Sequence, residues 1–134
     1  MDLSFGPEYD DFRGEVVTFL ANNADKAPKG GDLRGQQAKD WQKLLIENGY
    51  TCRTIPKEFG GYGAEPDIIK TRIIAEEFSK ARINTGLGGQ GISMLVPTLL
   101  EMGTQEQKEH FIRPPIMGDM IWCQGYSEPG AGSD

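Results

Sequence analysis

Apolar residues recur every three or four positions over most of this chain, and this helical spacing is the feature that most limits its fold. The first such segment runs from Pro7 to about Asn22, and proline suits the first turn of a helix. A second segment starts near Ala38, and Gly49 is placed to end it. A third opens at Pro66 and carries a broad apolar stripe. These three segments predict amphipathic helices that pack on one another.

Two further helices are predicted later in the chain. One covers about 89–102 in spite of Pro97. The next begins after Thr104, which forms a Thr-x-x-Gln capping box with Gln107, and we expect the proline pair at 114–115 to end it. The predicted fold class is therefore all-α, a domain of five to six helices.

After the proline pair the pattern changes from helical to strand-like. Residues 120–126 are rich in strand formers and have turn residues on both sides. We expect this stretch to be the first strand of a second unit. The chain would then divide into a helical domain of residues 1–119 and a short piece of a β domain, residues 120–134.

The composition argues against several classes of function. The 134 residues carry 20 acidic and 14 basic side chains, and no basic stripe is present to neutralise the phosphates of a nucleic acid. The longest uncharged run, 83–100, holds glycines, a serine and a proline, which makes it too polar to span a membrane. Two cysteines and one histidine have no metal-site spacing. We expect a soluble cytoplasmic protein with reduced thiols and without metal, nucleic-acid partner or membrane span.

The last ten residues form a glycine-rich turn that could bind an anion. Small residues occupy four of the last five positions, so successive backbone N–H groups could converge on a phosphate that approaches closely. On spacing alone an ordinary glycine-rich turn is the preferred explanation, because the pattern matches neither the Walker A loop nor the dinucleotide-binding fingerprint.

Three stretches of the chain resemble the acyl-CoA dehydrogenase family. Residues 122–134, Trp-Cys-Gln-Gly-Tyr-Ser-Glu-Pro-Gly-Ala-Gly-Ser-Asp, are similar to a signature of that family. Residues 55–63 resemble its Pro-x-Glu-aromatic-Gly-Gly-x-Gly connector, and residues 103–108 resemble its Gly-Thr-Glu-Glu-Gln-Lys turn. The three matches occur in the family's order and together extend the resemblance over nearly the whole chain.

The resemblance implies an FAD-dependent oxidoreductase of fatty-acid or lipid metabolism that desaturates an acyl-CoA between its α and β carbons. It implies the N-terminal helical domain of that fold, followed by a middle β domain and a C-terminal four-helix bundle. In the family a glutamate of the bundle removes the α proton, so we expect no catalytic residue in this chain and no activity from it alone. The implied partners are acyl-CoA, an electron-transfer flavoprotein or similar acceptor, and further subunits in a homo- or hetero-oligomer.

The resemblance also implies which residues contact the ligands. The Ser127 hydroxyl would donate a hydrogen bond to the flavin ring, and Gly132 and Ser133 would line its pyrophosphate. Ser133 would also contact the substrate, and Tyr126 departs from the aliphatic residue often found at its position. The full set of expected cofactor-binding residues is Gln124, Gly125, Tyr126, Ser127, Gly132 and Ser133.

The glycines between residues 86 and 91 correspond by resemblance to one wall of the acyl pocket. We expect them to open space for a bulky acyl group, with Met94 and Leu95 lining it. Simple helix packing is the alternative explanation for the same glycines.

Three functions stay open from the sequence. We prefer an FAD-dependent acyl-CoA dehydrogenase of which this is the N-terminal portion. An acyl-CoA oxidase or flavin monooxygenase of the same fold is the second, and the residues that would decide between these two are expected beyond Asp134. A non-catalytic partner subunit is the third.

Overall fold

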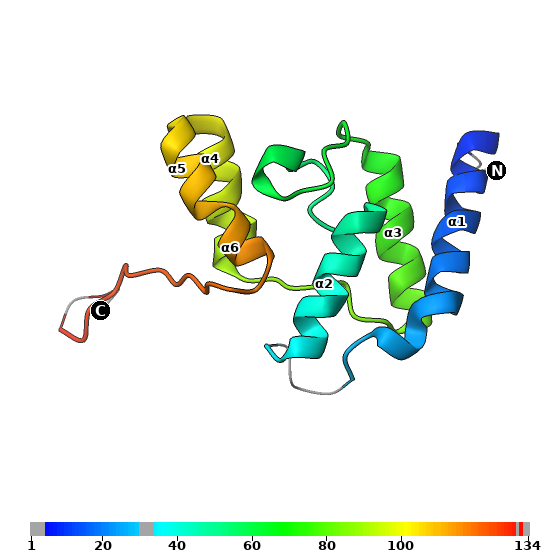
Figure 1. Cartoon of the computed structure of the whole chain (residues 1–134), viewed down its shortest axis with the longest axis horizontal. Helices are drawn as coiled ribbons and strands as arrows, with labels where there is room; N and C mark the ends of the chain where they lie inside the picture. Colours follow the sequence, from blue (N-terminus) through cyan, green and yellow to red (C-terminus); the bar gives the residue numbers. More distant parts are fainter. Residues whose placement is uncertain (1–4, 30–33, 131, 133–134) are drawn as a thin grey trace.

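The computed structural model describes residues 5–29, 34–130 and 132 of the chain. Within these ranges the structure is helical (Figure 1). Its elements are, in order, α1 (Pro7–Asn23), η1 (Ala24–Lys26), α2 (Gln36–Asn48), η2 (Lys57–Phe59), α3 (Ile68–Ala81), η3 (Gly91–Leu95), α4 (Val96–Met102), α5 (Gln105–Phe111) and α6 (Arg113–Ile116). The elements η1 and η2 are 3-10 turns, and η3 is a π-helical turn. The prediction of an all-α domain of five to six helices is confirmed.

One hydrophobic core joins the three longest helices, α1, α2 and α3. Helices α1 and α3 lie side by side, and α2 packs across them (Figure 1). Trp41 on α2 and Phe78 on α3 are almost completely buried in this core. Its other buried members are Phe12, Val16, Phe19, Leu20, Ala27, Leu45 and Ile73.

A second core lies under the shorter helices α4, α5 and α6. It contains Val96, Ile112 and Ile116, and it also buries Ile55 and Phe59 from the connector around η2. The two cores are separate clusters of buried side chains, and the hydrogen bond from Gln42 of α2 to the Ile116 carbonyl of α6 is one of the contacts between the two halves of the domain.

Local chemistry explains three helix ends, of which those at Gly49 and Thr104 were predicted. Gly49 takes the left-handed conformation at the C-terminus of α2, with φ of 79°. The Asp67 carboxylate accepts hydrogen bonds from two backbone N–H groups in the first turn of α3, each at 3.0 Å. Thr104 and Gln107 form the expected reciprocal capping box before α5.

The prolines act differently from the prediction. The helix predicted over 89–102 is divided into η3 and α4, because Pro97 has no N–H to donate to the carbonyl four residues before it and lies instead in the first turn of α4. Pro114 and Pro115 do not close the helical region. They lie in the first turn of α6, where the missing N–H groups would have had no partner inside the helix.

The strand predicted at residues 120–126 is not present in the described part of this structure. Residues 120–127 have no regular secondary structure and run away from α6 as the extension seen in Figure 1. A strand needs a neighbouring strand for its N–H and C=O groups, and the described residues provide none beside this segment. We call residues 118–127 the tail.

Among the described residues, no helix is both long enough and apolar enough to cross a membrane. The same residues contain no cluster of three or more side chains of the His, Cys, Asp or Glu type that would hold a metal ion.

Candidate functional site

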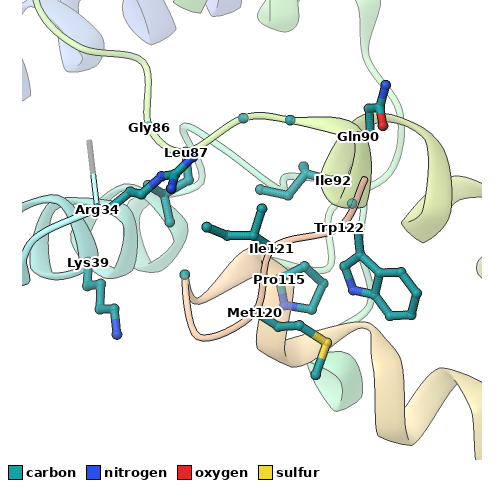
Figure 2. Close-up of a pocket in the computed structure, with 14 residues that line it drawn as sticks. Arg34, Lys39, Gly86, Leu87, Gln90, Ile92, Pro115, Met120, Ile121 and Trp122 are labelled. Atoms are coloured by element: carbon teal, nitrogen blue, oxygen red, sulfur yellow. The ribbon is translucent and has the colours of Figure 1, made fainter. Parts of the chain in front are cut away.

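A cavity of about 410 Å³ lies between α2, the segment before η3, the end of α6 and the tail (Figure 2). Most of the side chains around it are apolar, and they include Leu87, Ile92, Pro115, Ile121 and Trp122. Figure 2 shows Arg34 and Lys39 at one end of the cavity and Gln90 and Trp122 at the other. Its volume falls within the usual range of about 300–1,000 Å³ for small-molecule sites.

One wall of the cavity is the stretch of residues 84–89, which we call the glycine loop. Two consecutive residues of α2 hold it in place. Trp41 Nε1 donates to the Asn84 carbonyl at 2.8 Å, and the Gln42 side-chain oxygen accepts from the Leu87 N–H at 2.8 Å. The Asn84 side chain in turn accepts from the Gly86 N–H at 2.7 Å. The glycine loop is therefore fixed by hydrogen bonds although it has no regular secondary structure.

Gly86 allows the glycine loop to approach α2 closely. Its φ of +102° is unfavourable for residues with a Cβ, and a Cβ at this position would lie 2.5 Å from Gln42 Oε1. At Gly88 and Gly89, by contrast, an added Cβ would meet nothing within 4 Å. The first glycine is needed for packing, and the other two leave open space.

The opposite wall is formed by the tail, and Trp122 attaches this wall to the helices. A Cβ at Gly91 would lie 2.9 Å from Trp122 Cδ1, so the indole rests directly on the backbone of η3. The indole also meets Phe111 of α5 edge to face, with ring centroids 5.7 Å apart. Its Nε1 is buried and has no hydrogen-bond partner.

Gln124, an expected cofactor-binding residue, lies beside Met94, an expected substrate-binding residue. Gln124 Nε2 is 3.8 Å from Met94 Sδ, and Gln124 Oε1 accepts a hydrogen bond of 3.1 Å from Gln90 Nε2. The structure thus brings together two expected site residues from segments that are far apart in the sequence. On the cavity side, however, η3 contributes Gly91 and Ile92 rather than Met94 or Leu95. Leu95 is half-buried, and Met94 is exposed.

The other expected cofactor residues lie on the exposed end of the chain. Gly125, Tyr126 and Ser127 are exposed, and Tyr126 is 86% accessible to solvent. The turn after them brings Gly132 back to Ser127, since a Cβ on Gly132 would lie 3.6 Å from Ser127 Oγ. Ser133 lies outside the described residues. The Ser127 hydroxyl and the backbone N–H of Gly132 are suitable hydrogen-bond donors for a polar, phosphate-bearing ligand.

Cys52 lies close to the cavity but is not a reactive thiol. Burial raises its pKa to about 11, and its sulfur is 3.7 Å from Gln42 Nε2. Both cysteines are free, as expected, and Cys123 on the tail is exposed. At neutral pH Cys52 is therefore a small neutral packing residue.

Sequence reasoning missed Gln42, although its signal was present. It stands at a position of the apolar stripe of α2, together with Ala38, Trp41 and Leu45, where a core side chain is expected. A polar residue in such a stripe indicates a buried hydrogen-bond network. Gln42 is 0% exposed and bonds to both the glycine loop and α6.

Together the fold and the cavity define a helical domain with an apolar cavity of the size that small-molecule sites have. Comparison with known proteins identifies the family. Residues 6–119 match the family model described as "Acyl-CoA dehydrogenase, N-terminal domain". The chain therefore belongs to the acyl-CoA dehydrogenase family.

Individual relatives give the same result. The chain is 36% identical to "Acyl-CoA dehydrogenase IpdE1" of Mycolicibacterium smegmatis, over 95% of this chain and 34% of that protein. A structure described as "Tcur3481-Tcur3483 steroid ACAD" matches with a TM-score of 0.66 and 26% identity, over 98% of this chain and 34% of the other. The ChsE4-ChsE5 complex from Mycobacterium tuberculosis matches with a TM-score of 0.61 and 25% identity, over 98% and 33%. The chain spans about a third of the length of these relatives.

Proposed function

We propose that this chain is the N-terminal portion of an FAD-dependent acyl-CoA dehydrogenase that desaturates an acyl-CoA thioester between its α and β carbons. The contact of Gln124 with Met94 is the observation that carries the proposal, because it places the family's signature segment against η3, whose Gly91 and Ile92 line the apolar cavity. In this reading residues 1–119 form the helical domain, and residues 120–134 open the β domain.

This chain would provide some of the groups that the desaturation needs, and the other groups would come from FAD and from residues outside this chain. Removing an α proton from a thioester requires stabilisation of negative charge at the carbonyl oxygen and an acceptor for the hydride from the β carbon. FAD, when bound, supplies that acceptor. Ser127 and Gln124 would donate hydrogen bonds to the ring, and Gly132 and Ser133 would line the pyrophosphate. The base is expected from a glutamate that is not among these residues, so the 134-residue chain alone is expected to be inactive.

The residues around the cavity would bind the acyl group and shield it from water. Ile92, Leu87 and Trp122 provide an apolar surface that excludes water from the reacting carbons. We propose a bulky acyl group, because the space at Gly88 and Gly89 is open and because one structural relative is described as a steroid enzyme. Met94 and Leu95 would lie at the edge of this site.

Turnover by the full-length protein, of which this chain is the proposed N-terminal portion, tests the proposal, because the 134-residue chain alone is expected to be inactive. A polycyclic acyl-CoA and butyryl-CoA would be supplied with an artificial one-electron acceptor, and the product would be identified by the loss of two hydrogen atoms in its mass spectrum. We expect flavin absorbance and higher kcat/KM for the polycyclic thioester. A clear preference for butyryl-CoA would overturn the bulky-acyl proposal, and absence of both flavin and desaturation would overturn the function itself.

The acceptor and the assembly belong to the same proposal. An electron-transfer flavoprotein is the acceptor that fits a dehydrogenase, and equal rates with oxygen as sole acceptor would favour an oxidase instead. Because one matching structure is a complex of two named chains, we propose that the protein forms a homo- or hetero-oligomer. We also propose that it is located in the cytoplasm. Light scattering of the purified protein measures its mass, and a monomer would contradict this assembly.

A further inference from the structure

Gln42 lies behind the cavity, where it contacts the glycine loop on one side and α6, which leads into the tail that forms the other wall, on the opposite side. It lies on α2, is fully buried, and is separate from the side chains that line the cavity. Its Oε1 accepts from the Leu87 N–H of the glycine loop at 2.8 Å, while its Nε2 donates to the Ile116 carbonyl at the end of α6 at 2.9 Å. One amide therefore links the glycine loop to the helix from which the tail departs.

The close packing around this amide leaves little freedom to either wall. Gly86 approaches Gln42 Oε1 so closely that a Cβ would lie at 2.5 Å. On the other side of the link, Leu87 packs on the turn after α6, where a Cβ at Gly118 would lie 2.8 Å from Leu87 Cδ1. The glycine loop and the α6 turn are thus held together both by the amide of Gln42 and by direct contact.

We propose that Gln42 is a positioning residue that sets the separation of the two cavity walls and thereby the size of acyl group that binds. The inference rests on the proposed function, because it assigns the cavity to the acyl group. Its energetic basis is that a buried N–H or C=O without a partner is costly, so each wall stays at the distance at which its bond to Gln42 is made. A bulky acyl group contacts both walls and depends on their separation more than a short one does.

A neutral amide is the side chain that satisfies both walls at this reach. Methionine has a similar length but neither bonds the Leu87 N–H strongly nor donates to the Ile116 carbonyl. An ionised glutamate accepts from Leu87 but places negative charge against the Ile116 carbonyl. A protonated glutamate both donates and accepts, and therefore imitates glutamine.

The test uses the full-length protein with its flavin and compares Gln42→Met, Gln42→Glu and a control, Gln36→Met. Gln36 lies on the same helix but is exposed and bonds only to Asp40 among the contacts described. For each variant kcat and KM are measured with a polycyclic acyl-CoA and with butyryl-CoA. Gln42→Met removes both hydrogen bonds, and one lost hydrogen bond is worth up to about a factor of ten, so we expect this variant to raise the KM of the polycyclic substrate by at least about tenfold. The kcat values and the KM of butyryl-CoA should change by less than about twofold, and Gln36→Met should match the wild type.

The Gln42→Glu variant gives a pH readout that a general loss of stability would not produce. For the polycyclic substrate, the ratio of the KM of Gln42→Glu to the KM of the wild type at the same pH should be near one at pH 5.5. At pH 8 this ratio should rise toward the ratio found for Gln42→Met. The ratio to wild type removes the titration of other groups. These include Lys39, which pairs with Asp119 at 3.3 Å, Arg113 on α6, and the Cys52 thiol, whose pKa of about 11 keeps it neutral.

The outcomes separate the inference from the function on which it rests. A wild type that desaturates neither thioester overturns the proposed function and the inference with it. If the wild type is active and both Gln42 variants have the same ratio of polycyclic-substrate KM to butyryl-CoA KM as the wild type, the inference is overturned and the proposed function stands. If Gln42→Met fails to fold, Gln42→Glu at pH 5.5 and pH 8 decides, and a ratio that does not change with pH overturns the inference.

Discussion

Trp122 packs directly against the backbone at Gly91, where a Cβ would come within 2.9 Å of the indole Cδ1 and 3.3 Å of Pro115 Cβ. This contact attaches the tail to η3 and closes one end of the cavity. Gly91→Ala should therefore displace the indole and lower the free energy of unfolding by about 1–3 kcal/mol, the usual cost of overpacking. Urea unfolding followed by tryptophan fluorescence measures both effects.

Gly14 offers a matched control for this substitution. It lies within α1, and an added Cβ would meet nothing within 4 Å. Gly14→Ala should stabilise the chain by up to about 1 kcal/mol, because alanine loses less backbone entropy in a helix. Equal effects of the two alanines would show that the Trp122 contact does not hold the tail.

Cys52 and Cys123 should differ strongly toward alkylating reagents. A pKa of about 11 leaves Cys52 as thiolate in roughly one molecule in a thousand at pH 8, and its side chain is also shielded by packing against Gln42. Iodoacetamide at pH 8 should label the exposed Cys123 and leave Cys52 unlabelled until urea is added. Peptide mass mapping identifies the labelled site, and Cys123→Ser should take up no label in the folded state. Rapid labelling of Cys52 in the folded protein would contradict its burial.

Arg13 should make stability depend on pH through two glutamates of α3. It donates to Glu77 at 2.6 Å and to Glu76 at 2.9 Å, and these hydrogen bonds hold the pKa of both carboxyls below their ordinary value of 4.5. Because the folded-state pKa values are lowered, this stabilisation is present above about pH 4.5 and is lost as pH falls through the folded values. Arg13→Met should lower the Tm by several degrees at pH 7 and by much less at pH 3.

Arg72→Met is the control for the Arg13 prediction. Arg72 also pairs with Glu76 at 2.9 Å, but its side chain is 71% exposed, so solvent screens the pair. Its Tm should change little at either pH. A loss in Arg13→Met that is the same at pH 3 and pH 7 would assign the effect to packing of the arginine stem rather than to its charge.

Thr104 should stabilise α5 through its capping box. Its hydroxyl accepts from the Gln107 N–H at 3.1 Å, and the Gln107 side chain accepts from the Thr104 N–H at 3.0 Å. Thr104→Ala should lower the free energy of unfolding by about 1 kcal/mol. Thr98→Ala provides the comparison, since Thr98 of α4 is also exposed but its side-chain hydrogen bond is a local one to the Met94 carbonyl of η3, and this substitution should cost less than about 0.5 kcal/mol. Urea titrations that rank Thr98→Ala as the costlier change would refute the capping role.

Helix ends such as Thr104 could be predicted because their chemistry is local. A capping box or a left-handed glycine such as Gly49 needs only the few residues around it. The roles of Pro97 and Pro114 could not be predicted in the same way, since proline is tolerated in a first turn and disruptive later, and only the packing of the short helices decides where each turn begins. The prediction of a strand at residues 120–126 was wrong for the opposite reason. Strand propensity was present, but a strand forms only beside another strand.

The candidate site could be proposed from its residue types, but its contacts could not be predicted from the sequence. The signature segment predicted Gln124 and Ser127 as cofactor-binding residues, and the glycines between residues 86 and 91 predicted one wall of a cavity. Neither indicates that Gln124 meets Met94, or that the wall next to η3 is made by Gly91 and Ile92. Those relations depend on how α6 directs the tail across η3, which involves residues far apart in the sequence.

Ser127 should matter for flavin chemistry without affecting the fold. Its side chain is exposed on the tail and lies next to Gly132, where a hydroxyl can donate to the flavin ring in the function we propose. Ser127→Ala in the flavin-loaded protein should lower kcat/KM for the polycyclic acyl-CoA by about tenfold, as expected for one lost hydrogen bond, and leave Tm unchanged. Ser127→Thr keeps the hydroxyl and should retain most of the activity. Ser93→Ala removes another exposed hydroxyl, one that bonds to the Gly89 carbonyl at 3.0 Å, and should have little effect. If Ser127→Ala retains full activity with a normal flavin spectrum, the hydroxyl does not contact the ring.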